Sequence, residues 1–273
     1  MKLILHIEEN ISNAFDLADT LLIQLDDNML GYLLINQSEK KIFSWKIWQI
    51  DSPSELNQFF AQEFMLLNNA VSVKILNYTP RYSAFPADIS LKNTRTSFWE
   101  LSHGMNDKDT LLDYIAEEGT IFFMHAVQNE IYASIEKRFS TNQWISIQHI
   151  SFLTSKHETN STSMEICFFN QKTHIVLNQK GKVLFSQAFS YDNPEDLLWH
   201  LLNIIHVFGF SANEIVLYPH GLIDTQSSIF DLLNQYFNCI DSKKNHTYQM
   251  PTSDITLSAP TIDHIDRILT CVL

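Results

Sequence analysis

Hydrophobic segments separated by short polar turns form two similar series along the chain. Asp26, Asp27 and Asn28 interrupt the first series, and Asn170 and the pair Lys180 and Gly181 interrupt the second. Such residues are typical of turns between antiparallel strands. We therefore predict a three-stranded meander in each half, made of residues 21–25, 29–35 and 40–48 in the first and of residues 164–169, 173–177 and 182–189 in the second.

A helix start follows each predicted meander. Ser52, Pro53 and Glu55 occupy the N-cap, first and third helical positions of a capping box, and Asn193, Pro194 and Asp196 occupy the same positions in the second half. The apolar faces that these helices should turn toward their sheets are Leu56, Phe59, Phe60, Phe64 and Leu67 in the first and Leu197, Leu198, Leu201, Leu202 and Ile205 in the second. Residues 73–76 and 215–217 then predict a buried strand after each helix.

The two halves also match in sequence. Residues 33–44 align without a gap with residues 175–186, with identities that include Asn36 with Asn178. The match continues in order, because residues 51–56 align with 192–197 and residues 72–76 align with 213–217. We interpret this as one supersecondary unit used twice. We expect Asn36 and Pro53 to occupy the positions in the first half that Asn178 and Pro194 occupy in the second.

Composition and charge limit the partners. The 273 residues include 45% hydrophobic and 18% charged residues, which is typical of a globular chain, and the net charge is −13. An acidic chain does not favour binding to nucleic acid or to an anionic membrane. Three cysteines without CxxC spacing indicate neither a disulfide framework nor a zinc site. Because the sequence shows no signal peptide and no membrane span, we expect a cytoplasmic protein.

The repeated pattern of meander, helix and strand resembles the ribonuclease H-like unit of the actin, Hsp70 and sugar-kinase superfamily. Residues 120–153 look like the strand, helix and strand that join the halves in the branch of type IV pilus assembly protein M and the cell-division actin homologue. The segments NPEDLL and KGKVLFSQAF are similar to an uncharacterised Bacteroidetes family with an actin-like ATPase fold. The resemblance implies an α/β protein with two duplicated ribonuclease H-like domains with mixed sheets, at residues 1–154, with an insertion after residue 85, and at residues 155–273.

In that superfamily, two hairpins and a later glycine-rich segment hold a nucleotide in the cleft between the lobes. The corresponding candidates here are Asp26, Asp27, Asn28, Asn170, Gln171, Lys172, His220 and Gly221. Neither turn has an adjacent glycine to present N–H groups to phosphate, and the late segment has a single glycine. We therefore expect no bound cofactor. Asp26 and Asp27 have carboxylates that can bind a cation, but acidic turn residues are more often solvated.

The eleven histidines show no metal-ligand spacing. His200 and His206 lie six residues apart on one predicted helix, about 120° out of phase, so they cannot share one ion. His103, His125, His149 and His220 have no set of Cys, Asp or Glu ligands near them in the sequence, and no catalytic motif occurs. We therefore expect neither a metal nor a catalytic residue.

Two functions remain. The favoured one is a non-catalytic actin-like scaffold that binds a protein partner of unknown identity and has lost the nucleotide-binding motifs. The alternative is a divergent nucleotide-binding protein or ATPase that uses the cleft between the lobes.

Six aromatic residues can form either part of the core or an exposed recognition patch, and we expect them to be core because large aromatic side chains are more often buried. They are Trp45, Trp48, Phe98, Trp99, Phe122 and Phe123. The polar residues 155–163 and 241–254 predict exposed loops.

Overall fold

The structure is a computed structural model that describes residues 1–8, 14–52, 55–56, 59–60, 72–86, 92–104, 106–115, 121–139, 142–154, 161–239, 246–251 and 257–273. The chain forms two compact units, one of residues 1–149 with 249–254 and one of residues 150–248 with 255–273. The lobe limits expected from the sequence, 1–154 and 155–273, remain predictions. Pro53, Phe64, Leu67 and most of the two polar segments lie outside the described residues.

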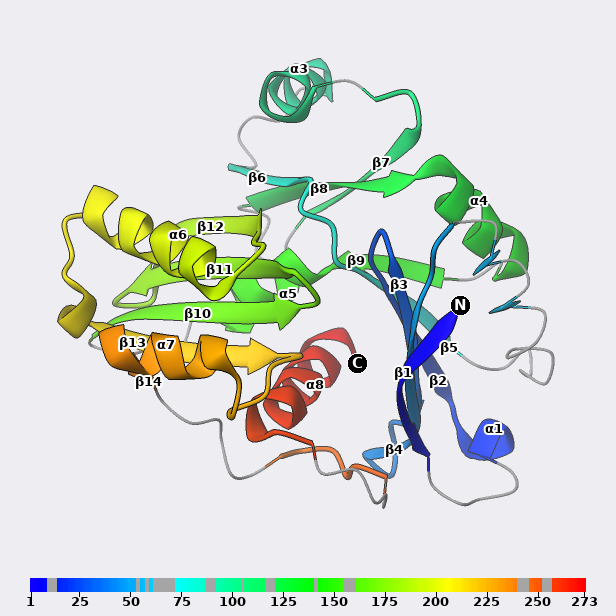
Figure 1. Ribbon diagram of the computed structural model, residues 1–273. Helices are drawn as coiled ribbons and strands as arrows, with labels where there is room; N and C mark the ends of the chain where they lie inside the picture. The colour runs from blue at the N-terminus through cyan, green and yellow to red at the C-terminus, as the bar shows by residue number, and fades with distance from the viewer. Residues whose placement is uncertain are drawn as a thin grey trace. The chain divides into compact units, whose positions relative to one another are not determined.

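The first unit contains a mixed sheet of strand order β1-β4-β3-β2-β5-β9 (Figure 1). Its strands are β1 (Lys2–Glu8), β2 (Thr20–Leu25), β3 (Met29–Asn36), β4 (Lys41–Gln49), β5 (Ser72–Asn77) and β9 (Asn142–Ser146). The neighbouring strands β1, β4, β3 and β2 each run antiparallel to the next, whereas β2, β5 and β9 run parallel to one another. The predicted meander and buried strand are therefore confirmed. The sequence analysis did not predict β1, an edge strand whose side chains are mostly exposed.

The main core of the first unit packs alternate residues of β2 and β3, such as Leu21 and Tyr32, against helical residues. Leu56 and Phe60 belong to this core and are buried, as predicted, with exposed fractions of 0% and 3%. The helix α4 (Asn129–Arg138) adds Ile131, which is buried in the same core. Every residue of β2 is buried, as expected for a central strand with both faces covered.

A smaller antiparallel sheet of order β6-β8-β7 completes the first unit. It is built from β6 (Tyr82–Pro86), β7 (Asp109–Ile115) and β8 (Ile121–Gln128), and the helices of this unit also include α1 (Ala14–Leu17) and α3 (Lys92–His103). The passage from β8 through α4 to β9 confirms the strand, helix and strand predicted for residues 120–153. Of the aromatic set, Phe98 alone is exposed, at 40%, and the other members are buried.

The second unit contains a sheet of order β12-β11-β10-β13-β14. Its strands are β10 (Thr162–Phe169), β11 (Lys172–Gln179), β12 (Lys182–Ser190), β13 (Ile215–Gly221) and β14 (Asn238–Cys239). Lys180 and Gly181 both have positive φ, 51° and 76°, and form the two-residue turn between β11 and β12. The strands predicted from the turn residues are therefore confirmed in this half as well.

Helices cover both faces of the second sheet. The helices from this part of the chain are α5 (Ile147–Thr154), α6 (Pro194–Val207), α7 (Ser228–Tyr236) and α8 (Ala259–Val272), with a 3-10 turn η1 (Ala212–Glu214) before β13. In Figure 1, α6 and α7 lie on one side of β10–β13 and α8 on the other. The side chain of Asn193 accepts a hydrogen bond from Asp196 N–H at 2.9 Å, which confirms the predicted N-cap of α6. Leu198 and Leu201 are buried, as predicted.

No helix among the described residues is both long and apolar enough to cross a membrane.

Candidate functional site

The first candidate turn, Asp26 to Asn28, joins β2 to β3. Asp26 N–H donates a hydrogen bond to the Met29 carbonyl at 2.9 Å, which closes the turn. The expectation that acidic turn residues are solvated is wrong for Asp26, whose side chain is 3% exposed, whereas Asp27 is exposed as expected. Asp26 Oδ1 accepts a hydrogen bond from Asp27 N–H at 2.7 Å. An N–H group that this turn can offer to an anion is therefore already bonded to a carboxylate of the chain.

The second candidate turn, Asn170 and Gln171, joins β10 to β11, and Lys172 begins β11. Asn170 has a φ of 56°, a left-handed conformation that asparagine tolerates better than most residues. Tyr191 donates two hydrogen bonds to the carbonyl groups of the turn. Its N–H donates to Gln171 O and its hydroxyl donates to Asn170 O, both at 3.1 Å. The turn is thus fixed by local bonds, with the Asn170 and Gln171 side chains exposed.

The third candidate segment, His220 and Gly221, ends β13. Gly221 has a φ of 106°, and a Cβ atom there would lie 2.1 Å from the carbonyl oxygen of Phe168. The close approach allows Leu222 N–H to donate to that same oxygen at 2.8 Å. Glycine is required here because β13 packs closely against β10. This packing accounts for Gly221, and no bound phosphate is needed to explain it.

These three segments do not fit a magnesium-bound polyphosphate. In the described part of the chain, neither turn contains a glycine, and the glycine of the third segment lies against the neighbouring strand. The structure brings Gly221 next to Phe168, two residues before Asn170, within one sheet. The first turn belongs to the other unit, so the convergence of all three segments remains a prediction.

His220 lies in a buried polar cluster that sequence spacing did not reveal. It is 3% exposed and is close to Cys167 of β10 and His264 of α8, which are also buried. Burial, with the nearby Arg267 guanidinium, holds the pKa of His220 well below its usual range, so the imidazole is neutral. The three clustered residues are far apart in the sequence, and only the pairing of β10 with β13 could have indicated that Cys167 and His220 are neighbours.

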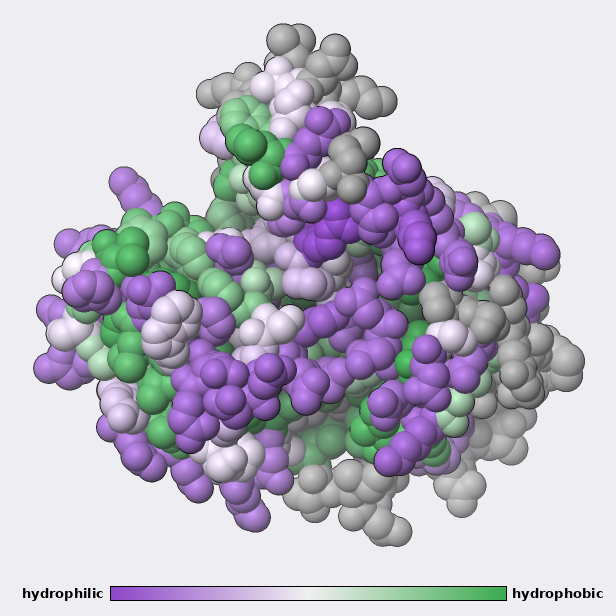
Figure 2. Space-filling view, turned by 45° about the horizontal axis from the view of Figure 1, so that its top comes forward, coloured by the Kyte–Doolittle hydropathy of each residue, from purple (hydrophilic) through white to green (hydrophobic). Residues whose placement is uncertain are grey.

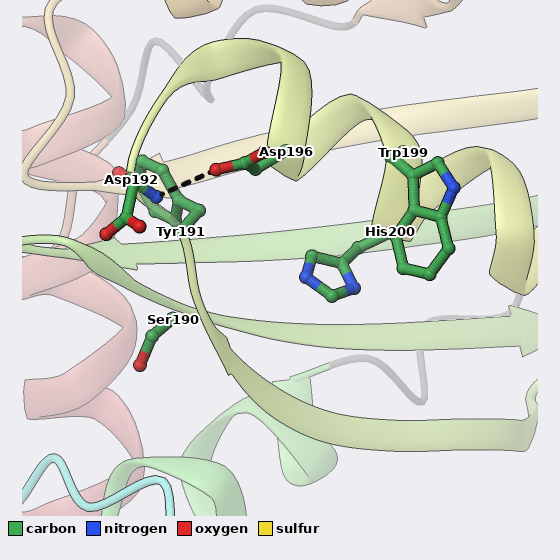
Figure 3. Close-up of a pocket in the computed structure, with 6 residues that line it drawn as sticks. All are labelled: Ser190, Tyr191, Asp192, Asp196, Trp199 and His200. Atoms are coloured by element: carbon green, nitrogen blue, oxygen red, sulfur yellow. Dashed lines mark hydrogen bonds between the residues drawn. The ribbon is translucent and has the colours of Figure 1, made fainter.

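A pocket with a volume of about 210 Å³ opens at the start of α6 (Figure 3). It is lined by Ser190, Tyr191, Asp192, Asp196, Trp199 and His200. Figure 3 shows Asp192 just before the helix, Asp196 in its first turn, and the rings of Trp199 and His200 beside one another. The centroids of these two rings are 5.1 Å apart. An aromatic ring near two carboxylates can hold a positively charged group. The sequence analysis did not identify this pocket.

Solved structures share the fold. A crystal structure from Bacteroides thetaiotaomicron VPI-5482, of a protein with an actin-like ATPase fold and unknown function, is similar over 96% of this chain and 100% of that chain, with 14% identity and a TM-score of 0.75. The PilM–PilN type IV pilus biogenesis complex is similar over 82% of this chain and 88% of that chain, with 11% identity and a TM-score of 0.56. The molecule is therefore an α/β protein with the actin-like ATPase fold.

The chain belongs to a family described as protein of unknown function (DUF3822), whose sequence profile matches residues 9–240. No sequence among curated proteins matches the chain significantly. At identities this low, the similar structures establish the fold alone.

Proposed function

We propose that this chain is an actin-like protein of the cytoplasm that binds another protein and has lost the ability to bind nucleotide. We further propose that its two units arose by duplication of one ribonuclease H-like unit. The shared strand order, β4-β3-β2-β5-β9 in one sheet and β12-β11-β10-β13-β14 in the other, supports the duplication. A similar solved structure is a complex of PilM with PilN, which suggests a protein as the class of partner.

The observation that carries the loss of nucleotide binding is the hydrogen bond from Asp27 N–H to Asp26 Oδ1. A phosphate at this turn would have to replace a buried carboxylate that already accepts the hydrogen bond of the N–H group. Without a cation between them, the carboxylate would also repel a polyphosphate, because two anions in a partly buried site interact strongly. The absence of glycine from both described turns adds to this effect, since side chains restrict how closely the backbone can approach a phosphate.

The exposed apolar surface of α6 and of Phe208, the residue that follows it, supports protein binding. Trp199, Val207 and Phe208 are 63%, 71% and 37% exposed, and Figure 2 shows hydrophobic surface over the second unit, at the left of the view. Asp192, Asp196 and Trp199 line the same pocket. This combination fits a segment of a partner protein with a lysine or arginine next to an apolar residue, since the cation can contact the carboxylates while the apolar residue contacts the indole.

The alternative, a divergent ATPase, retains one supporting observation. Asp27 is exposed at the first turn and has a carboxylate that can bind a cation. A rise of the melting temperature with ATP and magnesium, absent with magnesium alone, would favour this alternative over the proposed scaffold.

The protein-binding part is tested by placing a photo-crosslinking amino acid at Trp199 in cells that produce the full chain. The proposal predicts one dominant crosslinked protein at this position and none when the same amino acid replaces Leu101, which is 84% exposed in the other unit. Asp192→Asn should reduce the crosslink yield several-fold, because a carboxylate of the pocket is lost. Asp231→Asn, a matched change at an exposed position of α7, should leave the yield unchanged. Equal effects of the two changes, or equal crosslinking at Leu101, would contradict the proposed surface.

A further inference from the structure

The two faces of the second sheet differ in chemistry. Along β10, Met164, Ile166 and Phe168 belong to the apolar core that includes residues of α6 and α7. Successive strand residues point to opposite faces, so Glu165 and Cys167 lie on the face covered by α8. Both are buried, at 5% and 2% exposed, which is unusual for a carboxylate. Polar side chains inside a protein normally have hydrogen-bond or charged partners, because burying them without a partner costs free energy.

Three side chains on this polar face converge to within hydrogen-bonding or near-contact distances. Cys167 of β10 is paired with His220 of β13 in the parallel ladder, and α8 places His264 against both. Cys167 Sγ lies 3.7 Å from His264 Nδ1, and His220 Nδ1 lies 3.2 Å from His264 Nδ1. The potential ligand atoms of the three residues all lie within 4.8 Å of one another.

These separations match the edges of a tetrahedral zinc site. With Zn–N and Zn–S bonds of about 2.05 and 2.3 Å, tetrahedral angles place two nitrogen ligands about 3.3 Å apart and a nitrogen and a sulfur about 3.6 Å apart. The observed distances are 3.2 Å and 3.7 Å. The ligand types also agree, because imidazole and thiolate are the donors that zinc prefers. We propose that Cys167, His220 and His264 bind a Zn²⁺ ion in the interior of the second unit, with a water or small ligand as the fourth donor.

The surroundings of His220 support this assignment. Its Nε2 atom has no hydrogen-bond partner in the described part of the chain, and the nearest acid is Glu165, whose Oε2 lies 3.9 Å away. When the Nδ1 atom of a histidine binds a metal, a carboxylate commonly accepts the proton on the other ring nitrogen. Glu165 is itself held by Arg267 Nη1 at 3.1 Å and by Thr154 Oγ1 at 3.3 Å. A small movement of the imidazole toward Glu165 completes that arrangement.

The charges of the cluster balance around a divalent ion. Asp263 forms an ion pair with Arg267 at 2.7 Å, so these two side chains cancel. The remaining charges are those of the Glu165 carboxylate and of the Cys167 thiolate that zinc binding produces. On binding, the thiol proton leaves to solvent as the Zn–S bond forms. One Zn²⁺ therefore balances an interior in which the carboxylates of Glu165 and Asp263 share the single guanidinium of Arg267, and burial makes such compensation valuable.

The competing account is a proton shared between the two imidazoles. In that account one Nδ1 carries hydrogen and donates to the other, and Cys167 remains a thiol. It explains the 3.2 Å separation but assigns no partner to His220 Nε2. The two accounts differ in a measurable way, because only the zinc account requires a metal–thiolate bond.

The test uses the full chain, refolded from denaturant under reducing conditions with Co²⁺ or Zn²⁺, since a buried site fills as the chain folds. The proposal predicts one ion per chain by elemental analysis and, with Co²⁺, a thiolate-to-metal charge-transfer band in the near ultraviolet. Cys167→Ser should remove the band and weaken zinc binding by more than about a hundredfold, beyond the loss usual when a residue only orients a ligand. Cys271→Ser, on the same helix as His264 but outside the cluster, should change neither.

The wild-type spectrum keeps the test valid even if Cys167→Ser does not fold. A wild-type chain with native circular dichroism that binds no stoichiometric Zn²⁺ would overturn the proposal. A cobalt spectrum without the charge-transfer band would also overturn it, since Cys167 would then not be a ligand. Loss of binding in Cys271→Ser equal to that in Cys167→Ser would assign the metal to another site.

Discussion

The central sheets of the two units share a strand order, apart from the extra edge strand β1, but bury different chemistry on one face. The ladders pair Gln24 with Leu76 in the first unit and Cys167 with His220 in the second, at matching positions before the end of each parallel pair. Gln24 accepts a hydrogen bond from Trp45 Nε1 at 3.0 Å, so the first sheet satisfies its buried polar group with a neutral side chain. The second sheet places a thiol and imidazoles there. The strand arrangement is therefore shared, while this face is free to acquire a different role in each unit.

The ends of the two parallel pairs are alike in backbone and unlike in side chain. Tyr78 N–H donates to Leu25 O at 2.7 Å in the first unit, and Leu222 N–H donates to Phe168 O at 2.8 Å in the second. The residue before this bond is Asn77 in the first unit and Gly221 in the second. The same connection thus tolerates a side chain in one unit and requires glycine in the other.

The largest expected effect on stability comes from a substitution at Gly221, where the two units differ in side chain. Gly221→Ala should lower the free energy of unfolding by about 4 kcal/mol or more, because the new Cβ would lie 2.1 Å from Phe168 O at a φ of 106°. Gly209→Ala is the control: φ is 76°, and no described atom lies within 4 Å of the new Cβ, so the cost should be about 1 kcal/mol. Urea denaturation measures both, and equal costs would show that β13 does not approach β10 as closely as described.

A second prediction tests whether corresponding helices stabilise both units equally. Phe60→Ala should cost about 3 kcal/mol or more, since the ring is 3% exposed and packs edge-on against Phe59 and Phe139. Leu201→Ala, which removes a fully buried side chain of α6, should cost a similar amount. A denaturation midpoint unchanged by Phe60→Ala would mean that the helix face of the first unit is placed incorrectly.

The third prediction concerns a buried imidazole of the first unit. His125 of β8 is 1% exposed, and burial lowers its pKa to about 3, with a smaller contribution from His149. The unfolded chain takes up a proton near pH 6.5, whereas the folded chain does not, so stability falls as the pH decreases from 6.5 toward 3. His125→Phe should therefore reduce the loss of unfolding free energy between pH 7 and pH 5 by about 2 kcal/mol. A pH dependence of His125→Phe equal to that of the wild type would contradict the burial of a neutral imidazole at this position.

The smallest expected effect is at the start of α6. Asn193→Ala removes the bond from Asp196 N–H to the capping side chain and should cost about 1 kcal/mol. Asn203→Ala, at an exposed position within the same helix, should be neutral or slightly stabilising because alanine favours helix interiors. Thermal denaturation of the two variants gives the comparison, and equal shifts would contradict the capping role of Asn193.

The sequence predicted the strands and the start of α6 because short-range signals determine them. Alternating apolar residues and turn residues such as Asn170 and Gly181 act over a few positions, and Asn193 caps residues directly after it. The edge strand β1 was missed because its exposed side chains give no amphipathic pattern. The burial of Asp26 was also missed, since turn chemistry does not indicate whether a carboxylate points toward solvent.

The polar cluster of the second unit could be predicted only in part. If the duplication is used to pair β10 with β13, the register places Cys167 opposite His220. The third member, His264, is on a helix that has no counterpart in the repeated pattern, so nothing in the sequence indicates which sheet face it covers. Spacing rules for metal ligands fail here because each ligand comes from a different element.

The most direct test of the proposed loss of nucleotide binding is an isothermal titration of the full chain with ATP and magnesium, at a protein concentration of about 100 μM, where weak binding is still detectable. The account predicts no saturable heat, because Asp26 occupies the N–H group of its turn and no described turn contains a glycine between β2 and β3 or between β10 and β11. Saturable heat that disappears in Asp26→Ala or Asp27→Ala would contradict the account and identify the chain as a nucleotide-binding protein.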